Sequence, residues 1–523
     1  MRHRFRRPLR TLLLGALVVL IAAAPAHARA WDWALSDAQY KALNNFQRAQ
    51  YDRAAKLVKE KQYKAAAAEF EKFKVQFGAT LPKEMLAYVI FMRGYCLHHA
   101  KFRNEAIKVY QEVLDYFGDT IDAGAPALYY MGVAYLDNGD TRDGMECMLE
   151  MVEDPDYSKH PLAAGALNRL ADNHWRNEEK EQAIAYWKRV VGFWSVNPHH
   201  ARDAFEKVTR YYVANGQYDA YLAWRLESRD AENPKDRKDI AHNAYEAAHH
   251  VFHDRSGYYN QFSKKEMYDD ARTFMAWFRN QKDWFLKASD PWQYYHDCLH
   301  FLAHRLHDKA IIDEVSDGFF AWIGKVKDER WRNDRLDWAV DRFGEMGRWE
   351  HAQHAIGMIS DAPRAAYKEY QILVRQHKWK EGIERLEAAE QMGSDYWERR
   401  ARRERGEVYL HRLHQYDKAV EVFRLCDPPW SLWQIQECRV RQGRLDAALQ
   451  TLAEIEGSFP DDASKAAWRR AELYHKAGKR EQTVAECRRI LKKYPKSRES
   501  SEAHQLLEKL GVEVIGGGVH REE

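Results

Sequence analysis

Apolar residues recur at intervals of three and four along most of the chain, with polar residues between them. This spacing places the apolar side chains on one face of a helix and therefore predicts amphipathic helices. Short breaks rich in glycine, asparagine and aspartate separate the helical segments. The sequence has no sustained alternation of apolar and polar residues, the pattern that predicts strands. We therefore expect an all-α protein made of many consecutive helices.

Small residues also recur twelve positions apart. Gly132 is followed by Gly144, and Ala471 is followed by Thr483, with Pro495 a further twelve positions on. A small side chain lets two antiparallel helices cross closely, while larger side chains fill the gap to the next pair. The spacing predicts a series of helical hairpins. The small residue expected on the second helix of each hairpin stands at positions 66, 106, 144, 183 and 220, and again at 352, 382, 419, 448 and 483.

This spacing resembles the tetratricopeptide repeat, a hairpin of two helices that we call A and B. The resemblance implies a right-handed α-solenoid in which hairpins stack and the A helices line a groove that holds a protein or peptide partner. Near the C-terminus, Phe459-Pro460, Ala471 and Tyr494-Pro495 also resemble the repeat proteins that coordinate envelope assembly in Gram-negative bacteria. That likeness implies an adaptor associated with envelope complexes.

The hairpin pattern is strong near both ends and fades in the middle, where longer helices would also explain the sequence. We expect two arrays with an irregular helical segment between them, and a localised function would lie in that departure from the pattern. The expected parts are a signal peptide at residues 1–30, an N-terminal array at 31–228, an irregular segment of long helices at 229–345, a C-terminal array with a capping helix at 346–511, and a disordered tail at 512–523.

The first thirty residues have the features of a secretory signal. Several arginines precede an apolar run from Thr11 to Ala24, and the small residues Ala28 and Ala30 precede the expected cleavage point after Ala30. The apolar run is shorter than the roughly 20 residues that span a bilayer, which disfavours the alternative of an uncleaved anchor. We therefore expect no membrane span after cleavage, and a periplasmic or secreted protein.

Cleavage also changes the charge of the chain. The formal net charge is +3, and residues 1–30 contain six arginines and no other charged residue, so the remaining chain has a charge of 3 − 6 = −3. No stripe of lysine and arginine follows a helix face in the way that phosphate binding requires. We therefore expect no nucleic-acid partner.

Six cysteines are present, and an oxidising compartment would allow disulfides. Cys96, Cys147 and Cys487 fall at apolar positions of the repeat, where cysteine serves as a small core residue. Cys426 and Cys438 flank a Pro-Pro pair and are the two that could form a local disulfide. No cysteine near the cleavage point could carry a lipid.

Two groups of histidines are spaced for one helix face each. His296, His300 and His304 form the first, with His307 following, and His242, His249 and His253 form the second. Histidines four residues apart can share a metal ion, and the two groups would join if their helices faced each other. A solvated polar helix face is the simpler interpretation because apolar residues occupy the adjacent stripe. A metal-handling or haem-handling protein is the alternative, and we expect no cofactor.

Tryptophan is also concentrated in the middle of the chain. Exposed tryptophans could stack on sugars or hold a peptide, although aromatic residues at helical spacing more often belong to the core. An exported all-α enzyme that acts on glycans, a polysaccharide lyase or hydrolase, is therefore a second alternative. The sequence contains no nucleophile elbow and no phosphate-binding glycine loop, so we expect a binding protein rather than an enzyme. The tryptophans are Trp277, Trp284, Trp292, Trp322, Trp331 and Trp338.

Three asparagines are the candidate partner-binding residues. Asn138, Asn168 and Asn173 lie on or near expected A helices in the units that match the repeat best. An amide can both donate to and accept from the backbone of a bound peptide. We predict that these residues contact a protein partner, although Asn138 could instead close a turn.

Overall fold

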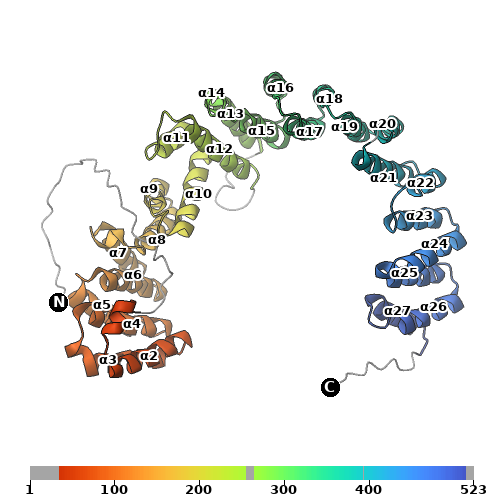
Figure 1. Cartoon of the computed structure of the whole chain (residues 1–523). Coiled ribbons are helices and arrows are strands. Elements are labelled where there is room, and N and C mark those ends of the chain that lie inside the picture. Colours follow the sequence, from red (N-terminus) through yellow and green to blue (C-terminus); the bar gives the residue numbers. More distant parts are fainter. Residues whose placement is uncertain (1–34, 255–263, 393, 514–523) are drawn as a thin grey trace. The chain divides into compact units, whose positions relative to one another are not determined.

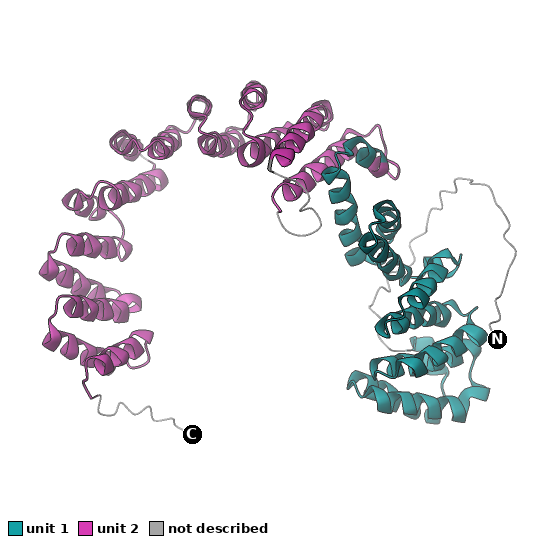
Figure 2. Ribbon diagram, turned by 180° about the vertical axis from the view of Figure 1, so that it is seen from behind, with its two compact units in different colours: residues 1–223 teal, residues 224–523 magenta. Residues whose placement is uncertain are grey.

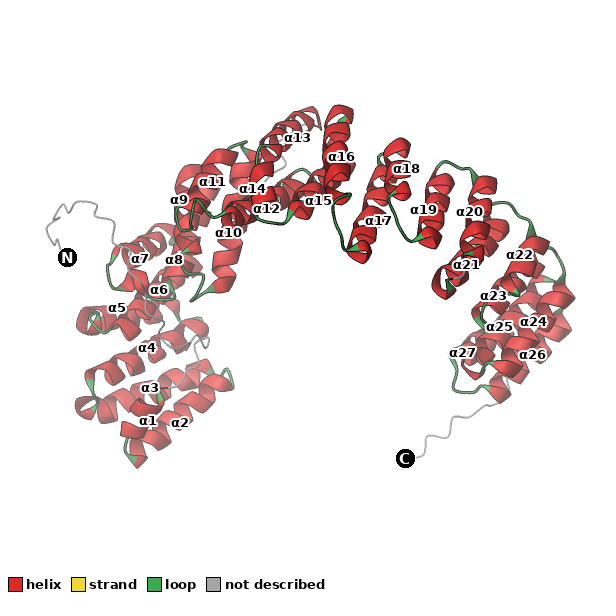
Figure 3. Cartoon of the chain, turned by 45° about the horizontal axis from the view of Figure 1, so that its top comes forward, coloured by secondary structure: helices red, strands yellow, loops and turns green. Residues whose placement is uncertain are grey.

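The computed structural model describes residues 35–254, 264–392 and 394–513, and this part of the chain contains helices and no strand. Short loops connect the helices (Figure 3). The all-α prediction is confirmed. The expected signal peptide lies outside the described residues, as does nearly all of the expected disordered tail.

The chain divides into two compact units, Met1–Ala223 and Trp224–Glu523 (Figure 2). The domain limits expected from the sequence remain predictions.

Unit 1 is a stack of hairpins that follows a short first helix, α1 (Asp37–Ala42) (Figure 1). From α2 to α9, each A helix packs on its own B helix, and each B helix packs on the next A helix, ending with α9 on α10. The hairpins are α2 (Asn45–Lys59) with α3 (Tyr63–Phe77), α4 (Lys83–His99) with α5 (Arg103–Phe117), α6 (Ile121–Asp137) with α7 (Thr141–Glu153), α8 (Ala163–Arg176) with α9 (Lys180–Val191), and α10 (Pro198–Ala214) with α11 (Tyr218–Leu226), which contains the division between the units.

Unit 2 begins with a less regular group of helices and continues as hairpins that end in a single capping helix. The first group is α12 (Pro234–Val251), α13 (Lys264–Arg279) and α14 (Lys282–Lys287). The hairpins are α15 (Pro291–Phe301) with α16 (Lys309–Ile323), α17 (Glu329–Glu345) with α18 (Trp349–Gly357), α19 (Ala362–Arg375) with α20 (Trp379–Gln391), α21 (Asp395–His411) with α22 (Tyr416–Phe423), α23 (Trp430–Arg441) with α24 (Leu445–Ser458), and α25 (Ala463–Lys476) with α26 (Arg480–Lys493), before the cap α27 (Arg498–Lys509).

The small residues stand where the sequence predicts, at the crossings of A and B helices. A Cβ atom added to Gly132 would lie 2.8 Å from Met148, and one added to Gly144 would lie 2.7 Å from Leu136. Nine of the ten marker positions are buried. The exception is Ala220, which is exposed, because the neighbouring Tyr221 occupies the core of its hairpin. The marker at 220 was therefore wrong.

The turn from helix A to helix B has one shared backbone feature. The residue before the N-cap of the B helix has a positive φ, which closes the A helix and reverses the chain. Glycine supplies this conformation in five hairpins, at positions 139, 216, 347, 443 and 478. Five further hairpins use Lys61, Lys101, Glu178, His377 and His414 at the same place.

The α15–α16 hairpin differs from the others. Its A helix ends in a π-helix, η3 (Leu302–Leu306), and His307 then adopts a φ of +50°. Asp308 caps α16 by accepting hydrogen bonds from the backbone N–H groups of Ala310 and Ile311 at 3.1 and 3.2 Å. A π-helix requires an extra residue in the turn, which amphipathic spacing does not reveal.

All six cysteines are free thiols. Five are buried, and Cys426, which follows the end of α22, is half-buried. The local disulfide between Cys426 and Cys438 is therefore not formed. Within the described ranges, the helices are too short or too polar to cross a membrane.

Candidate functional site

The predicted asparagines all lie in unit 1, on two neighbouring hairpins. Asn138 follows the last residue of α6 and is exposed, and its side-chain amide donates a hydrogen bond to Asn104 at 2.9 Å. This contact joins the turn after α6 to the start of α5. Asn138 therefore has a structural partner, and its role in binding remains a prediction.

Asn168 and Asn173 share helix α8. The Asn168 side chain is buried, and its amide oxygen has no hydrogen-bond partner among the described residues. Asn173 is half-buried. The unsatisfied oxygen of Asn168 makes it the better placed of the two to accept a hydrogen bond from a ligand.

The structure brings the two histidine groups of the middle segment together in unit 2. Helix α12 lies against α15, and the His249 and His300 rings stack with centroids 4.9 Å apart. The His300 and His304 centroids are 4.5 Å apart, and those of His296 and His300 are 5.8 Å apart. The sequence predicted each group but left open whether they join.

A buried carboxylate holds one end of this cluster. Asp297 is fully buried and accepts hydrogen bonds from His242 at 2.6 Å, from Gln293 at 2.8 Å and from His296 at 3.0 Å. Burial would lower the pKa of His242, but the hydrogen bond to Asp297 and its charge raise it overall. Asp297 therefore fixes α12 on α15 through charged hydrogen bonds.

The other end of the cluster has neutral imidazoles. Burial, followed by the proximity of His304 and His249, lowers the pKa of His300 to about 3. Burial and the charge of Arg305 lower the pKa of His249 to about 4. Nδ1 of His300 lies 2.6 Å from the hydroxyl of Tyr245. In the part of the chain that the structure describes, no three histidine, cysteine or acidic side chains are arranged to hold a metal ion.

Four of the six tryptophans gather beside the histidines on α15, α16 and α17. Trp292 contacts Trp338, with centroids 5.2 Å apart, and Trp338 lies over His296 at 4.7 Å. The Arg335 guanidinium lies 4.5 Å from the ring of Trp331 and 5.0 Å from that of Trp292. These tryptophans are half-buried, so they pack on one another and still present part of their surface.

Side chains on successive A helices of unit 2 continue this row. Helices α17 and α19 are joined by Arg364 with Asp337 at 2.7 Å and by Lys368 with Asp341 at 3.1 Å. Helices α19 and α21 are joined by the hydroxyl of Tyr367, which donates to Glu404 at 3.2 Å. We call this row the A-helix face, and it comprises Trp292, His296, Trp331, Arg335, Trp338, Arg364, Tyr367, Arg400, Arg403 and Trp430.

Two arginines on α21 are the most exposed cations of the A-helix face. Arg400 lies over the ring of Tyr367 at 4.7 Å, and Arg403 lies over that of Trp430 at 4.1 Å. No carboxylate of the described residues lies within ion-pair distance of either one. By contrast, Arg402 and Arg405 on the same helix pair with Glu390 of α20. Sequence reasoning missed Arg400 and Arg403 because they belong to no motif.

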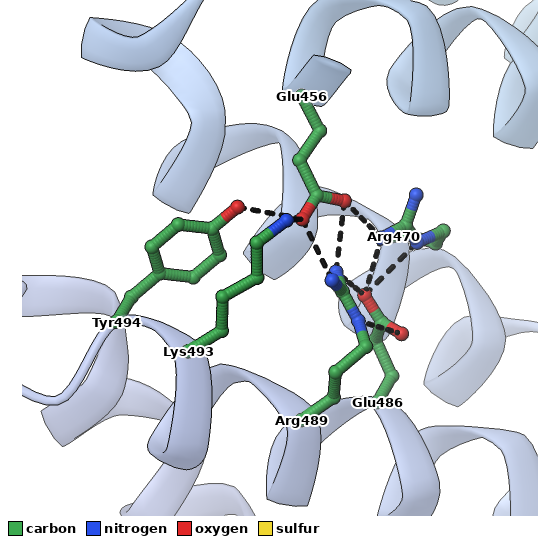
Figure 4. Close-up of polar contacts among 6 residues, drawn as sticks. All are labelled: Glu456, Arg470, Glu486, Arg489, Lys493 and Tyr494. Atoms are coloured by element: carbon green, nitrogen blue, oxygen red, sulfur yellow. Dashed lines mark hydrogen bonds and ion pairs between the residues drawn. The ribbon is translucent and has the colours of Figure 1, made fainter.

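A second polar cluster joins three successive helices of the C-terminal hairpins. Glu456 of α24 accepts hydrogen bonds from Arg489 at 2.7 Å, from Lys493 at 2.9 Å and from the hydroxyl of Tyr494 at 2.6 Å, and it also pairs with Arg470 (Figure 4). Its side chain is only 7% exposed. The donors that surround this carboxylate are all taken up within the protein, so the cluster is structural.

Comparison with protein families identifies one repeat in the C-terminal part of the chain. Residues 465–497 match the tetratricopeptide repeat family. The match covers α25 and α26 and their exit, so this hairpin is similar to that repeat. No curated protein matches the sequence.

Two solved structures align along most of the chain. A structure of the APC/C hetero-tetramer Cut9–Hcn1 is 14% identical, covering 90% of this chain and 97% of the other, with a TM-score of 0.27. Yeast Tom70 is 10% identical, covering 89% of this chain and 96% of the other, with a TM-score of 0.24. The fold assignment depends on the stacked hairpins and the matched repeat.

Proposed function

We propose that this protein is a scaffold that binds a polypeptide partner along the A-helix face of unit 2. The observation that carries the proposal is the pair Arg400 and Arg403, exposed and held on aromatic rings without a carboxylate partner. Stacking restricts each guanidinium while leaving N–H groups at its edge available to a ligand. Binding rather than catalysis is part of this proposal.

The composition of the face supports protein binding. Tryptophan, tyrosine and arginine are enriched among residues that contribute most to protein interfaces, because they bring large contact area with few rotatable bonds. The A-helix face contains these three types on five successive A helices of unit 2, from α15 to α23. Its ion pairs between helices hold the rings and guanidinium groups in place before a partner arrives.

A pull-down from an envelope extract tests the proposal. The Arg400→Ala/Arg403→Ala variant is expected to retain less than about a tenth of the partner captured by the wild type, because it loses two guanidinium anchors. Arg424→Ala/Arg412→Ala is the control, since both of its arginines are exposed and lie outside the A-helix face. Equal capture by the two double variants, with unchanged thermal unfolding, would contradict the proposal.

We also propose that the scaffold acts outside the cytoplasm, in the periplasm or as a secreted protein associated with envelope complexes. The support is the basic start, the apolar run and the alanines at 28 and 30 in the sequence. Cell fractionation and N-terminal sequencing test this directly. A mature N-terminus at Trp31 is expected, and a cytoplasmic protein that retains Met1 would contradict it.

A further inference from the structure

The end of α15 combines two unusual backbone features. The π-helix Leu302–Leu306 is followed by His307 with a positive φ. Both conformations cost energy, and both are found preferentially at functional sites. The π-turn brings His304 beside α17, where Arg342 donates a hydrogen bond to its Nε2 at 2.8 Å. The His304 ring also lies 6.4 Å from that of His249 on α12, and the pKa of His249 is lowered by burial and then by the charge of Arg305.

Arg305 lacks the acidic partner that most half-buried arginines have. Its one hydrogen bond goes to the backbone oxygen of His304 at 3.4 Å, and its Nε is buried without a partner. No carboxylate of the described residues forms an ion pair with it. Nε2 of His249 is also buried and has no hydrogen-bond partner. One buried nitrogen on α12 and one in the π-turn are therefore unsatisfied, on segments that the contact between the His249 and His304 rings brings together.

The carboxylates around this group already have basic partners. On α17, Arg342 is already paired with Glu345 at 2.8 Å, and Glu345 lies 3.9 Å from His304. On α15, the carboxylate of Asp297 is occupied by His242, Gln293 and His296. Further titratable groups on these elements include Tyr245, Glu246 and His250 on α12, His253 after it, His307 after the π-turn, and the pair of Arg272 on α13 with Asp308.

We propose that His249, His300, His304 and Arg305, here called the π-turn site, bind the carboxylate of an aspartate or glutamate in the docked partner. This inference rests on the proposed function and names one chemical feature of the partner. A carboxylate supplies the counter-charge that Arg305 lacks and can accept from its planar N–H groups and from an imidazole N–H at once. The site is on the same row of A helices as Trp338, so one extended segment reaches both.

The test uses the full chain and a defined probe. Fluorescein-labelled octaglutamate is titrated with the protein at low salt and followed by anisotropy, with octaglutamine as the uncharged counterpart. The wild type is expected to bind octaglutamate and not octaglutamine. Arg305→Gln is expected to weaken binding about ten-fold, because one charge-assisted interaction is lost. Arg424→Gln removes the same charge from an exposed position of unit 2 and is expected to change binding less than two-fold.

Several outcomes would overturn the inference. Equal effects of Arg305→Gln and Arg424→Gln would show that only net charge matters. Absence of octaglutamate binding by the wild type would show that the π-turn site does not bind carboxylates. Displacement of octaglutamate by inorganic phosphate, beyond the effect of chloride at equal ionic strength, would assign the site to phosphate instead.

The two proposals fail separately. If Arg305→Gln captures the partner from extract as well as the wild type, while Arg400→Ala/Arg403→Ala does not, the scaffold stands and the π-turn site is excluded. If Arg305→Gln fails to fold, Arg305→Lys keeps the charge without the planar donors. It is then expected to bind octaglutamate more weakly than the wild type, and unchanged affinity would count against the site.

Discussion

Single glycines decide how closely the helices of a hairpin approach. A Cβ atom added to Gly406 on α21 would lie 2.3 Å from the buried ring of Phe423 on α22. We expect Gly406→Ala to destabilise the protein by about 1–3 kcal/mol, because the ring cannot move without displacing its own neighbours. Urea denaturation followed by circular dichroism measures the change.

Gly457 on α24 is the matched control. An added Cβ would meet no atom within 4 Å there. Gly457→Ala should therefore stabilise by about 0.5–1 kcal/mol, since alanine has the higher helix propensity and restricts the unfolded chain. If both substitutions change the free energy of unfolding in the same direction, the glycine at position 406 is not required for the close approach of α21 and α22.

Residue spacing also explains which site residues could have been predicted. On α21, Arg403 and Arg400 stand three and six positions before the crossing residue Gly406. On α19, Tyr367 and Arg364 stand at the same two distances before Tyr370, which faces Gly382. This register identifies the side chains of an A helix that meet the next A helix. Amide chemistry alone pointed instead to unit 1 and to Asn138, which has a partner of its own.

At the scale of helices, the hairpins could be predicted and the backbone at α15 could not. Nine markers lie in the core because the crossing of two helices requires a small residue at a fixed spacing. The prediction for Ala220 was wrong because the adjacent residue, Tyr221, is the one that is buried in the core of this hairpin. The π-helix keeps its apolar residues buried, as an α-helix would, so Leu302 and Leu306 carry no signal of it. Contact between α12 and α15 depends on packing between segments, which spacing within one helix does not determine.

The carboxylate of Glu456 joins three helices and gives the C-terminal hairpins a pH dependence. Burial would raise the pKa of Glu456, but hydrogen bonds from Arg489, Tyr494, Lys493 and Arg470 hold it well below its usual range. The ionised carboxylate of Glu456 is therefore more stable in the folded state than in the unfolded state. Its stabilisation is present above the ordinary glutamate pKa, near 4.5, and is lost as the pH falls toward the lower folded pKa.

We expect Glu456→Gln to destabilise the protein by about 1–3 kcal/mol at pH 7, because the largely buried Arg470 and the half-buried Arg489 lose the charge of their shared acceptor. The difference in free energy of unfolding between the variant and the wild type should shrink from about pH 5 to about pH 3, because Glu456 in the unfolded wild type becomes protonated in this range. Glu502→Gln breaks one exposed pair, with Arg498, and should cost less than about 1 kcal/mol. Denaturation at several pH values measures both, and a constant difference across pH would contradict the role of Glu456.

At the scale of the whole chain, stability in stacked hairpins is approximately a sum of the hairpins and the contacts between neighbours. The reactivity of buried cysteines can reveal the stability of individual hairpins, because these cysteines are distributed across both units. Cys96 and Cys147 lie in unit 1, and Cys298, Cys438 and Cys487 lie in unit 2. Each becomes accessible to a thiol reagent only when its own hairpin opens.

Thiol labelling therefore tests burial and the absence of a disulfide in one measurement. In native buffer, at most one equivalent should react, and slowly, because Cys426 is half-buried and burial raises its pKa to about 11. In guanidinium without a reductant, six equivalents should react at once. Reaction of four equivalents would show that Cys426 and Cys438 form a disulfide. Rapid reaction of several thiols in native buffer would show that the hairpins open independently under folding conditions. Because the chain contains a cysteine on α4, α7, α15, α23 and α26, the order in which these sites become reactive with rising guanidinium would identify the hairpins that open first.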